Sequence, residues 1–526
     1  MASSVISSSP FVCKSSQPKD LGFPKSSQIS VHRCQKRSIS RKIVSVMAPQ
    51  RSSSTTGSVK TGMTMTEKIL AKAAEKSQVV PGDNIWVNVD VLMTHDVCGP
   101  GAFGIFKREF GEKAKVWDPE KIVVIPDHYI FTTDKRANRN VDIMRSIAGN
   151  RISSISMISP TLEIFGLILT TKVFAMWRLL KKVLLGTDSH TCTAGAFGQF
   201  ATGIGNTDAG FVLGTGKILL KVPPTMRFIL DGEMPSYLQA KDLILQVSVI
   251  SFLQHLSPFT ASELLTGHFR HKCEIIGEIS VAGATYKTME FSGTTIESLT
   301  MEERMTLCNM VVEAGGKNGV IPPDATTFNY VENRTSVPFE PVYSDGNASF
   351  VADYRFDVSK LEPVVAKPHS PDNRALAREC KDVKIDRVYI GSCTGGKTED
   401  FMAAAKLFHA AGKQVKVPTF LVPATQKVWM DVYALPVPGA GGKTCAQIFE
   451  EAGCDTPTSP SCGACLGGPA DTYARLNEPQ VCVSTTNRNF PGRMGHKEGQ
   501  IYLASPYTAA ASALTGHVTD PREFLQ

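Results

Sequence analysis

Three cysteines of this chain stand in sequences that could bind a metal or carry out redox chemistry. Cys462 and Cys465 form a close pair in SPSCGACLGGP, and Cys393 lies 69 residues earlier in IGSCTGGKTED. Thiolates are the usual protein ligands of iron–sulfur clusters, and the small residues around each cysteine would let backbone N–H groups approach the sulfur. The spacing alone leaves a zinc site, a redox-active pair and ordinary buried thiols open as alternatives.

Two other segments place a carboxylate beside an imidazole directly after an apolar run. Asp127 and His128 follow KIVVIP, and Asp188, Ser189 and His190 follow KVLLG. A carboxylate that orients and charges an imidazole is the arrangement that general acid–base catalysis requires. A loop pair hydrogen-bonded to the backbone is the alternative for any one of these segments.

Polar residues in two further segments suit the binding of an acidic substrate. Asn309 and Glu313, in CNMVVEAGG, are four residues apart and are predicted to share one helix face. The segment NRNFPGRMG places Asn487, Arg488 and Arg493 around a Pro-Gly turn. Two guanidinium groups on one loop suit a di- or tricarboxylate, and surface salt bridges are the alternative.

Short β-type runs alternate with helical stretches and must position these residues. Helices are predicted from TMTEKILAKAAEK, MEERMTLCNMVVEAGG and TEDFMAAAKLFHAAGK. Strands are predicted from NIWVNVDVLM, KIVVIP, KVLLGTD, DRVYIGSC, VKVPTFLVPA and PQVCVSTT. The alternation indicates an α/β fold with mainly parallel sheets, in which ligands gather beyond the carboxyl ends of the strands. The Pro-rich stretch 337–372 is predicted to be a linker.

The composition is that of a globular protein with a basic leader. The 526 residues are 42% hydrophobic and 20% charged. The first 60 residues hold ten Lys and Arg, one acidic residue and seventeen Ser, so the rest of the chain is close to neutral. That distribution argues against nucleic-acid binding. A Ser-rich, basic leader without an apolar core predicts a chloroplast transit peptide over residues 1–50. A membrane span at 161–180 is disfavoured because charged residues interrupt the apolar run.

Taken together, these motifs resemble the aconitase family. The matching blocks are GTDSHTCTAGAFGQFATGIGNTDAG, CNMVVEAGG, IGSCTGGKTEDF, SPSCGACLGGP and NRNFPGRMG, and in order and spacing they cover most of residues 64–526. The resemblance implies three α/β/α subdomains around an iron–sulfur cluster, without the family's mobile fourth domain. We expect these subdomains at 61–225, 226–375 and 376–526.

The resemblance also implies a cofactor and roles for the candidate residues. Cys393, Cys462 and Cys465 would hold one [4Fe–4S] cluster per subunit, whose fourth iron binds the substrate. Asp127 and His128 would protonate the departing hydroxyl. Asp188 and His190 would extend the acid–base network, with Glu313 as the partner of His190. The substrate and cluster contacts implied are Ser189, Asn309, Asn487, Arg488 and Arg493.

The implied reaction isomerises 2-isopropylmalate to 3-isopropylmalate by dehydration and rehydration, in leucine biosynthesis in the chloroplast stroma. Methylthioalkylmalates of glucosinolate biosynthesis are possible further substrates. In this branch of the family the fourth domain is a separate chain, so we expect a heterodimer with an isopropylmalate isomerase small subunit. Homoaconitase, citraconate hydratase, a non-catalytic iron or RNA-binding regulator and a zinc protein are the alternatives.

Two segments, 146–182 and 247–273, depart from the family's sequence. The family normally has another histidine about twenty residues before the DSH triplet, and no histidine lies between His128 and His190 here. We hypothesise that a shifted reading frame produced the first segment and a retained intron the second. A chain that really contains both would be catalytically impaired.

Overall fold

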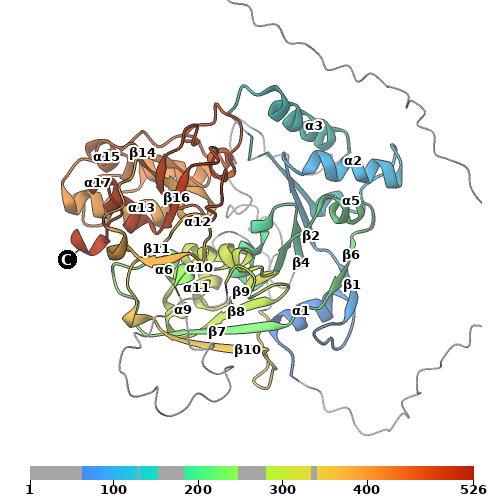
Figure 1. Cartoon of the computed structure of the whole chain (residues 1–526). Helices are drawn as coiled ribbons and strands as arrows, with labels where there is room; N and C mark the ends of the chain where they lie inside the picture. The colour runs from blue at the N-terminus through green and yellow to red at the C-terminus, as the bar shows by residue number, and fades with distance from the viewer. Residues whose placement is uncertain are drawn as a thin grey trace, which may run out of the picture. The chain divides into compact units, whose positions relative to one another are not determined.

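The computed structural model describes residues 62–126, 128–129, 131–151, 183–246, 280–332, 334 and 341–525, without the side chains of residues 148–151. The first helix, α1 (Met65–Ala73), begins where the sequence predicts it. Thr64 and Glu67 form a capping box, in which each side chain accepts a hydrogen bond from the other residue's backbone N–H. Three larger sheets and one two-stranded ribbon follow (Figure 1).

The first sheet has four parallel strands in the order β3-β2-β4-β5. These strands are β2 (Val91–His95), β3 (Ile122–Ile125), β4 (Val183–Gly186) and β5 (Phe200–Gly203). Every residue of β3 and β4 is buried, as expected for strands covered on both faces. Around them lie the antiparallel ribbon β1 (Asn84–Asn88) and β6 (Lys217–Lys221), with α2 (Gly99–Phe110), η1 (Pro119–Lys121), α3 (Lys135–Arg151), η2 (Ser189–Phe197) and α5 (Asn206–Thr215). Because β2, β3 and β4 are parallel neighbours, the residues that follow them meet at one edge.

The second sheet is also parallel, in the order β10-β7-β8-β9. Its strands are β7 (Thr225–Asp231), β8 (Thr288–Ser292), β9 (Asn318–Val320) and β10 (Ala352–Asp357). The accompanying elements are α6 (Ala240–Leu245), α9 (Thr294–Ser298), α10 (Met301–Asn309), η4 (Met310–Ala314), α11 (Ala325–Glu332) and η5 (Val358–Lys360). Helix α10 packs against η2 of the first sheet, so residues at its end can reach the loop that follows β4.

The third sheet has six strands in the order β12-β11-β16-β15-β13-β14. The strands are β11 (Val364–Ala366), β12 (Arg374–Leu376), β13 (Arg387–Gly391), β14 (Thr419–Val422), β15 (Val481–Ser484) and β16 (Gln500–Ala504). Its helices are η6 (Ala377–Cys380), α12 (Ser392–Gly395), α13 (Thr398–Ala411), α14 (Gln426–Ala434), α15 (Cys445–Glu451), α16 (Gly463–Leu466), α17 (Pro506–Thr515) and η7 (Pro521–Glu523). The four strands from β16 to β14 are parallel, and β11 and β12 pair antiparallel at one edge.

One apolar core contains buried residues of all three sheets, among them Met93, Phe228 and Tyr389. Cys393 and Cys462 belong to this same core. A second core, which includes Phe401, packs α13, α15 and α17 within the third sheet's layers. The shared core therefore fixes the first sheet's loops against the loops that carry the cysteines.

The predicted α/β class with parallel sheets is confirmed. The first sheet lies within the predicted subdomain 61–225, and the second lies within 226–375 except for the first residue of β7. The third sheet crosses the predicted boundary at 375, because β11 and most of β12 come from 226–375 and its other strands come from 376–526. The linker predicted at 337–372 is wrong in its described part, which contributes β10 and β11 to two sheets. Strand β10 lies at a sheet edge and exposes every second residue. It therefore has no apolar run from which the sequence would predict a strand. The single strand predicted over 84–93 is divided into β1 and β2.

The two atypical segments lie outside the described residues, except that residues 146–151 end α3. The stretch 161–180 also lies outside them. In the part of the chain that the structure describes, no helix has the length and apolarity to cross a membrane.

Candidate active site

A cavity of about 270 Å³ is enclosed by loops of the first and third sheets. Ten of the thirteen residues proposed from the sequence line it. The complete lining is His95, Val97, Cys98, His128, Thr187, Asp188, Ser189, His190, Ser392, Cys393, Cys462, Cys465, Leu466, Asn487, Arg488 and Arg493. The cavity therefore brings all three candidate sulfur ligands together with imidazole, carboxylate and guanidinium groups.

Cys393 reaches the cavity through a tight turn after β13. Ser392 has a φ of 76°, a left-handed conformation that non-glycine residues rarely adopt. Gly395 lies so close to a neighbouring segment that a Cβ there would be 2.4 Å from Thr485 Cβ. The turn is thus packed from both sides, which fixes the direction of the cysteine side chain.

Cys462 and Cys465 lie at the short helix α16. A Cβ on Gly463 would be 2.5 Å from Thr472 Cγ2 and 3.3 Å from the backbone oxygen of His128. The small residue between the cysteines therefore lets α16 approach the loop that carries His128. Cys393, Cys462 and Cys465 are all buried, with 7%, 8% and 6% of their surface exposed.

Polar hydrogens point at the sulfur atoms of Cys393 and Cys465. Asn309 Nδ2 donates to Cys393 Sγ at 3.2 Å, and Asn487 Nδ2 donates to the same sulfur at 3.4 Å. Arg493 Nη2 lies 3.9 Å from Cys465 Sγ. Donors of this kind stabilise sulfur that carries negative charge, as the sulfur of metal-bound cysteine does.

The donor set fits an iron–sulfur cluster. Three buried thiols share one cavity, and N–H groups are directed at them. Burial raises the pKa of the Cys393 thiol to about 11. Near neutral pH that thiol keeps its proton unless a bound metal replaces it.

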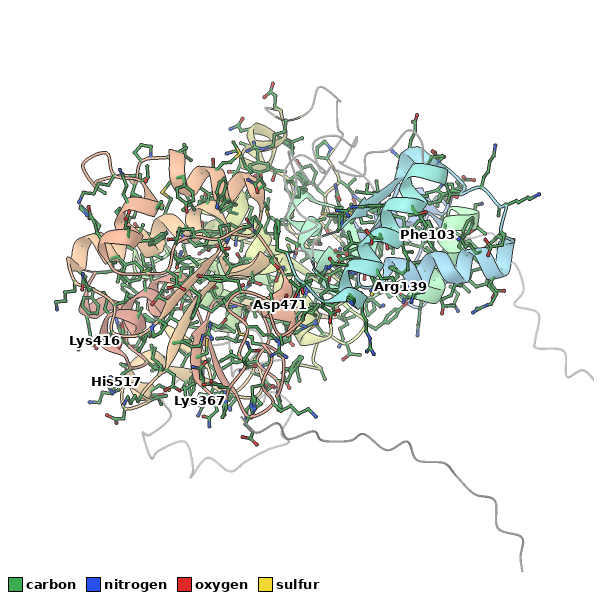
Figure 2. The ribbon with its side chains drawn as sticks, turned by 90° about the horizontal axis from the view of Figure 1, so that it is seen from above. Phe103, Arg139, Lys367, Lys416, Asp471 and His517 are labelled. Atoms are coloured by element: carbon green, nitrogen blue, oxygen red, sulfur yellow. The ribbon has the colours of Figure 1, made fainter. Side chains whose placement is uncertain are left out.

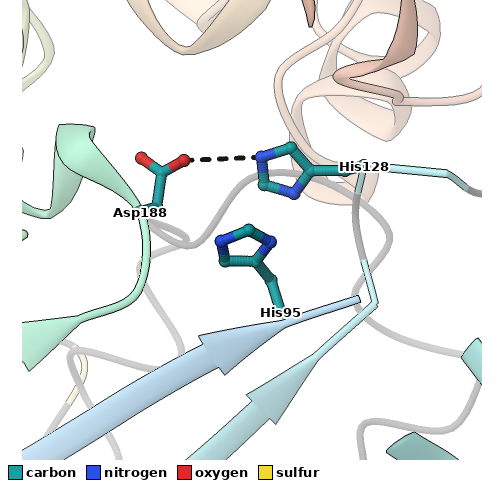
Figure 3. Close-up of side chains that lie close together, drawn as sticks. All are labelled: His95, His128 and Asp188. Atoms are coloured by element: carbon teal, nitrogen blue, oxygen red, sulfur yellow. Dashed lines mark ion pairs between the residues drawn. The ribbon is translucent and has the colours of Figure 1, made fainter. Parts of the chain in front are cut away.

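His128 and Asp188 form the ion pair drawn in Figure 3, with His128 Nε2 3.4 Å from Asp188 Oδ2. The ring of His95 is stacked on that of His128, with 4.1 Å between the ring centroids. On the other side, Asp96 is fully buried and accepts a hydrogen bond from the backbone N–H of His128 at 3.0 Å. His128 is therefore fixed by the carboxylate of Asp188, by the stacked ring of His95 and by the hydrogen bond from its backbone N–H to Asp96.

Asp188 also contacts the second imidazole of the site. Its Oδ1 accepts a hydrogen bond from the backbone N–H of His190 at 2.6 Å and lies 3.4 Å from His190 Nδ1. Burial alone would raise the pKa of the Asp188 carboxyl, but hydrogen bonds from His128 and His190 bring it well below its usual range. Asp188 is thus a carboxylate at neutral pH and joins the two imidazoles.

Glu313 joins His190 to an arginine of the cavity wall. His190 Nε2 lies 3.0 Å from Glu313 Oε1, and Arg488 Nε donates to both oxygens of Glu313 at 2.8 and 2.9 Å. Arg488 Nη2 donates to Ser189 Oγ at 3.1 Å. Burial would raise the pKa of Glu313, but the hydrogen bond from His190 and the charge of Arg488 lower it.

Two anchors fix the loops that carry the polar residues. Asn489, fully buried next to Arg488, donates through Nδ2 to the backbone oxygens of Lys367 at 2.8 Å and Ile501 at 3.2 Å. Asp471, labelled in Figure 2, accepts hydrogen bonds from Thr132 Oγ1 and from the backbone N–H of Thr133, both at 2.6 Å. The second anchor ties the His128 loop to the segment that follows α16.

The structure brings together twelve of the thirteen predicted residues, and the thirteenth, Asp127, lies outside the described residues. Asn309 and Glu313 contact the site from behind the cavity wall. The prediction that these two share one α-helix is wrong, because α10 ends at Asn309 and Glu313 lies in the 3₁₀ helix η4. The tighter winding turns Glu313 towards His190, while Asn309 faces Cys393.

Sequence reasoning missed His95 and Asp96. Both are buried, and His95 lines the cavity. Their signal was present, since an imidazole and a carboxylate stand side by side one residue after the apolar run VLM, much as in the two segments that were recognised. His95 also gives the site a third imidazole, although no histidine lies between His128 and His190.

The sequence matches the aconitase family, described as aconitate hydratase, over residues 67–254, 273–380 and 375–516. The chain belongs to the aconitase family. The interval without a match, 255–272, falls inside the atypical segment 247–273. Sequencing of the transcript tests whether that segment is a retained intron, and a transcript that encodes it as an exon would refute the hypothesis.

Several curated relatives are similar over nearly their whole length. The chain is 82% identical to the chloroplastic 3-isopropylmalate dehydratase large subunit of Arabidopsis thaliana, which covers 99% of this chain and 100% of the relative. It is 39% identical to 3-isopropylmalate dehydratase large subunit 1 of Methanopyrus kandleri, covering 88% and 100%. It is 40% identical to a probable methanogen homoaconitase large subunit of Methanosarcina mazei, covering 83% and 99%.

Proposed function

We propose that this chain is the large subunit of a plastid 3-isopropylmalate dehydratase, a hydro-lyase of leucine biosynthesis. One observation carries the proposal: three buried cysteines, two arginines and a linked His128–Asp188–His190 group line one cavity, and Glu313 joins His190 to Arg488 from behind its wall. The 82% identity to a chloroplastic large subunit of that name favours isopropylmalate over the other acids handled by the family.

Cys393, Cys462 and Cys465 hold a [4Fe–4S] cluster in this proposal. When bound, a cluster held by these three cysteines would supply Lewis acid chemistry to the hydroxyl group that leaves the substrate. Asn309 and Asn487 orient Cys393 through the hydrogen bonds to its sulfur. Asn487 lines the cavity beside Cys393, and Asn309 contacts the same sulfur from behind the cavity wall.

The proton that leaves with the hydroxyl comes from His128. Asp188 Oδ2 lies 3.4 Å from its Nε2 and can stabilise a charged ring, and Asp127 is the further carboxylate of the pair proposed from the sequence. His190, between Asp188 and Glu313, extends the network to the cavity wall. General acid–base groups held in this way typically contribute about 10²–10⁴-fold to a rate.

The substrate is a dicarboxylic acid, and the two arginines differ in their freedom to bind it. Arg488 is held by Glu313 and Ser189. Among the described residues, no hydrogen-bond partner lies at the buried Nε of Arg493. We assign Arg493 to a substrate carboxylate, and Arg488 with Ser189 to the positioning of the substrate near His190.

A small subunit completes the enzyme in this proposal. It covers the cavity and supplies the base that removes the proton from the neighbouring carbon, and the active form is a heterodimer. The basic, Ser-rich leader and the chloroplastic relative support a location of this pair in the chloroplast stroma.

Co-expression with a plastid small subunit tests the proposal. We expect the anaerobically purified pair to be brown and to convert 2-isopropylmalate much faster than citrate or homocitrate. The large subunit alone should show no turnover. A preference for homocitrate would favour the homoaconitase alternative, and a colourless protein with one zinc per chain would refute the cluster.

A further inference from the structure

Lys241 is a fully buried lysine behind the loop that carries Asn487 and Arg488. It lies in α6 and is 1% exposed. Its Nζ donates to the backbone oxygens of Thr486 at 2.5 Å and Thr485 at 3.4 Å. Thr486 directly precedes Asn487, whose side-chain amide donates to Cys393 Sγ. The lysine therefore holds the main chain one residue away from a group that contacts a proposed cluster ligand.

In the part of the chain that the structure describes, the ammonium group of Lys241 forms no ion pair with a carboxylate. Among the described residues, no Asp or Glu oxygen lies within 4.0 Å of its Nζ. The other buried cations of this region are paired, Lys397 with Asp400 at 2.6 Å and Arg304 with Asp324 at 2.6 Å. An unpaired charge in the interior is strongly disfavoured, so a countercharge is to be expected nearby.

The ionisable groups whose charges most affect the pKa of Lys241 indicate which countercharge it can have. They are Cys393, Lys397, Glu313 and Asp400. Lys397 and Asp400 neutralise each other, and Glu313 is bound by Arg488 at 2.8 Å. A thiolate-ligated cluster held by Cys393 would then be the uncompensated negative charge of this group.

We propose that Lys241 is the buried countercharge of the iron–sulfur cluster and the positioning residue of the Asn487 loop. The inference rests on the proposed cluster. In the chain without metal, burial lowers the pKa of Lys241 to about 7, and the neighbouring Cys393 opposes that shift. The anionic cluster would keep the ammonium group charged. Charge and hydrogen bonds near a cluster are the main influences on its reduction potential.

Three variants of the full chain test this inference. Lys241→Met removes the charge and the hydrogen bonds, and Lys241→Gln removes the charge but keeps a donor for the Thr486 oxygen. Lys406→Met is the matched control, because Lys406 is an exposed lysine that lines the same hollow as Lys241. For each reconstituted chain we would measure iron per chain, the lifetime of the visible absorbance under a chelator, and the midpoint potential by EPR-monitored titration. Thermal unfolding would be measured with and without the cluster.

We expect both Lys241 variants to have a lower midpoint potential and a several-fold shorter cluster lifetime than the wild type and Lys406→Met. The chain without a cluster should be as stable as the wild type or more stable, because an unpaired buried charge has been removed. Equal destabilisation with and without the cluster, at unchanged potential, would make Lys241 a packing residue and overturn the inference. If the midpoint potential is lowered in Lys241→Met but not in Lys241→Gln, the effect comes from the hydrogen bonds, and the proposed role of Lys241 as countercharge is overturned. A wild-type chain that binds no cluster would overturn the proposed function, and this inference with it.

Discussion

His190 and Arg488 share one carboxylate, because Glu313 Oε1 lies 3.0 Å from His190 Nε2 and 2.8 Å from Arg488 Nε. Glu313 lies in η4, which follows α10 in the second sheet's segment, whereas His190 follows β4 and Arg488 follows β15. A single buried side chain thus couples loops of all three sheets. The candidate site depends on this carboxylate for both its charge and its geometry.

Glu313→Gln should lower kcat by about 100-fold or more. The amide keeps the volume of the side chain but removes the charge that orients His190 and binds Arg488. Steady-state kinetics of the reconstituted pair on 2-isopropylmalate would measure the loss. The control is Glu297→Gln, an exposed glutamate of α9, which should behave as the wild type. Equal kinetics for the two variants would remove Glu313 from the network.

The contribution of Glu313 to stability should depend on pH. Its pKa is lowered in the folded chain from an ordinary value of 4.5, so its contribution is complete above that value and is lost as the pH falls through the lower, folded pKa. At pH 7 we expect Glu313→Gln to reduce the free energy of unfolding by roughly 3–5 kcal/mol. The difference in unfolding free energy between the variant and the wild type should disappear at acidic pH. Urea unfolding of the metal-free chain at several pH values would measure this, and a gap that widens below pH 4.5 would contradict it.

The sequence predicted the elements and residue types of the site better than their contacts. Runs such as KIVVIP and KVLLG are buried on both faces and predict strands correctly, so the residues after them were assigned to a common edge. The pair His95 and Asp96 also follows a strand and could have been assigned to that edge, but the contact of Asp96 with the backbone N–H of His128, 32 residues later, could not be predicted from the sequence. The edge strand β10 and the change from α10 to η4 at Asn309 were also missed, since tertiary contacts decide both.

Arg493→Lys should raise KM for 2-isopropylmalate more than it lowers kcat. A lysine keeps the charge but loses the planar pair of donors that fits a carboxylate. Loss of one charge-assisted hydrogen bond, about 1.5–3 kcal/mol, corresponds to roughly 10–100-fold in KM. Arg378→Lys, in a surface ion pair with Glu362, is the control. An unchanged KM would show that Arg493 does not bind the substrate.

Cys462→Ser should abolish stable cluster binding, because only two thiolates would remain. Iron, acid-labile sulfide and the visible spectrum after anaerobic reconstitution would measure the loss. Cys454→Ser is the matched control, since Cys454 is only partly buried and does not line the cavity. The control should keep the full iron content. A Cys462→Ser chain with wild-type iron would exclude this cysteine as a ligand.

His95 should act on catalysis through the orientation of His128. The two rings are stacked with centroids 4.1 Å apart, and both residues line the cavity beside Asp188 (Figure 3). His95→Phe keeps an aromatic ring against His128, whereas His95→Leu removes the stacking. If positioning is the main role, the leucine variant should lose about tenfold more kcat than the phenylalanine variant, since ring contacts of this kind contribute about 0.5–1.5 kcal/mol.

The pH profile of kcat separates the two roles that His95 can have. If His95 only positions His128, the pH profile of kcat for His95→Phe should keep both limbs of the wild-type profile. If His95 itself transfers protons, one limb should be missing from the profile of His95→Phe. Equal, large losses in both variants together with an altered profile would make His95 itself an acid–base residue.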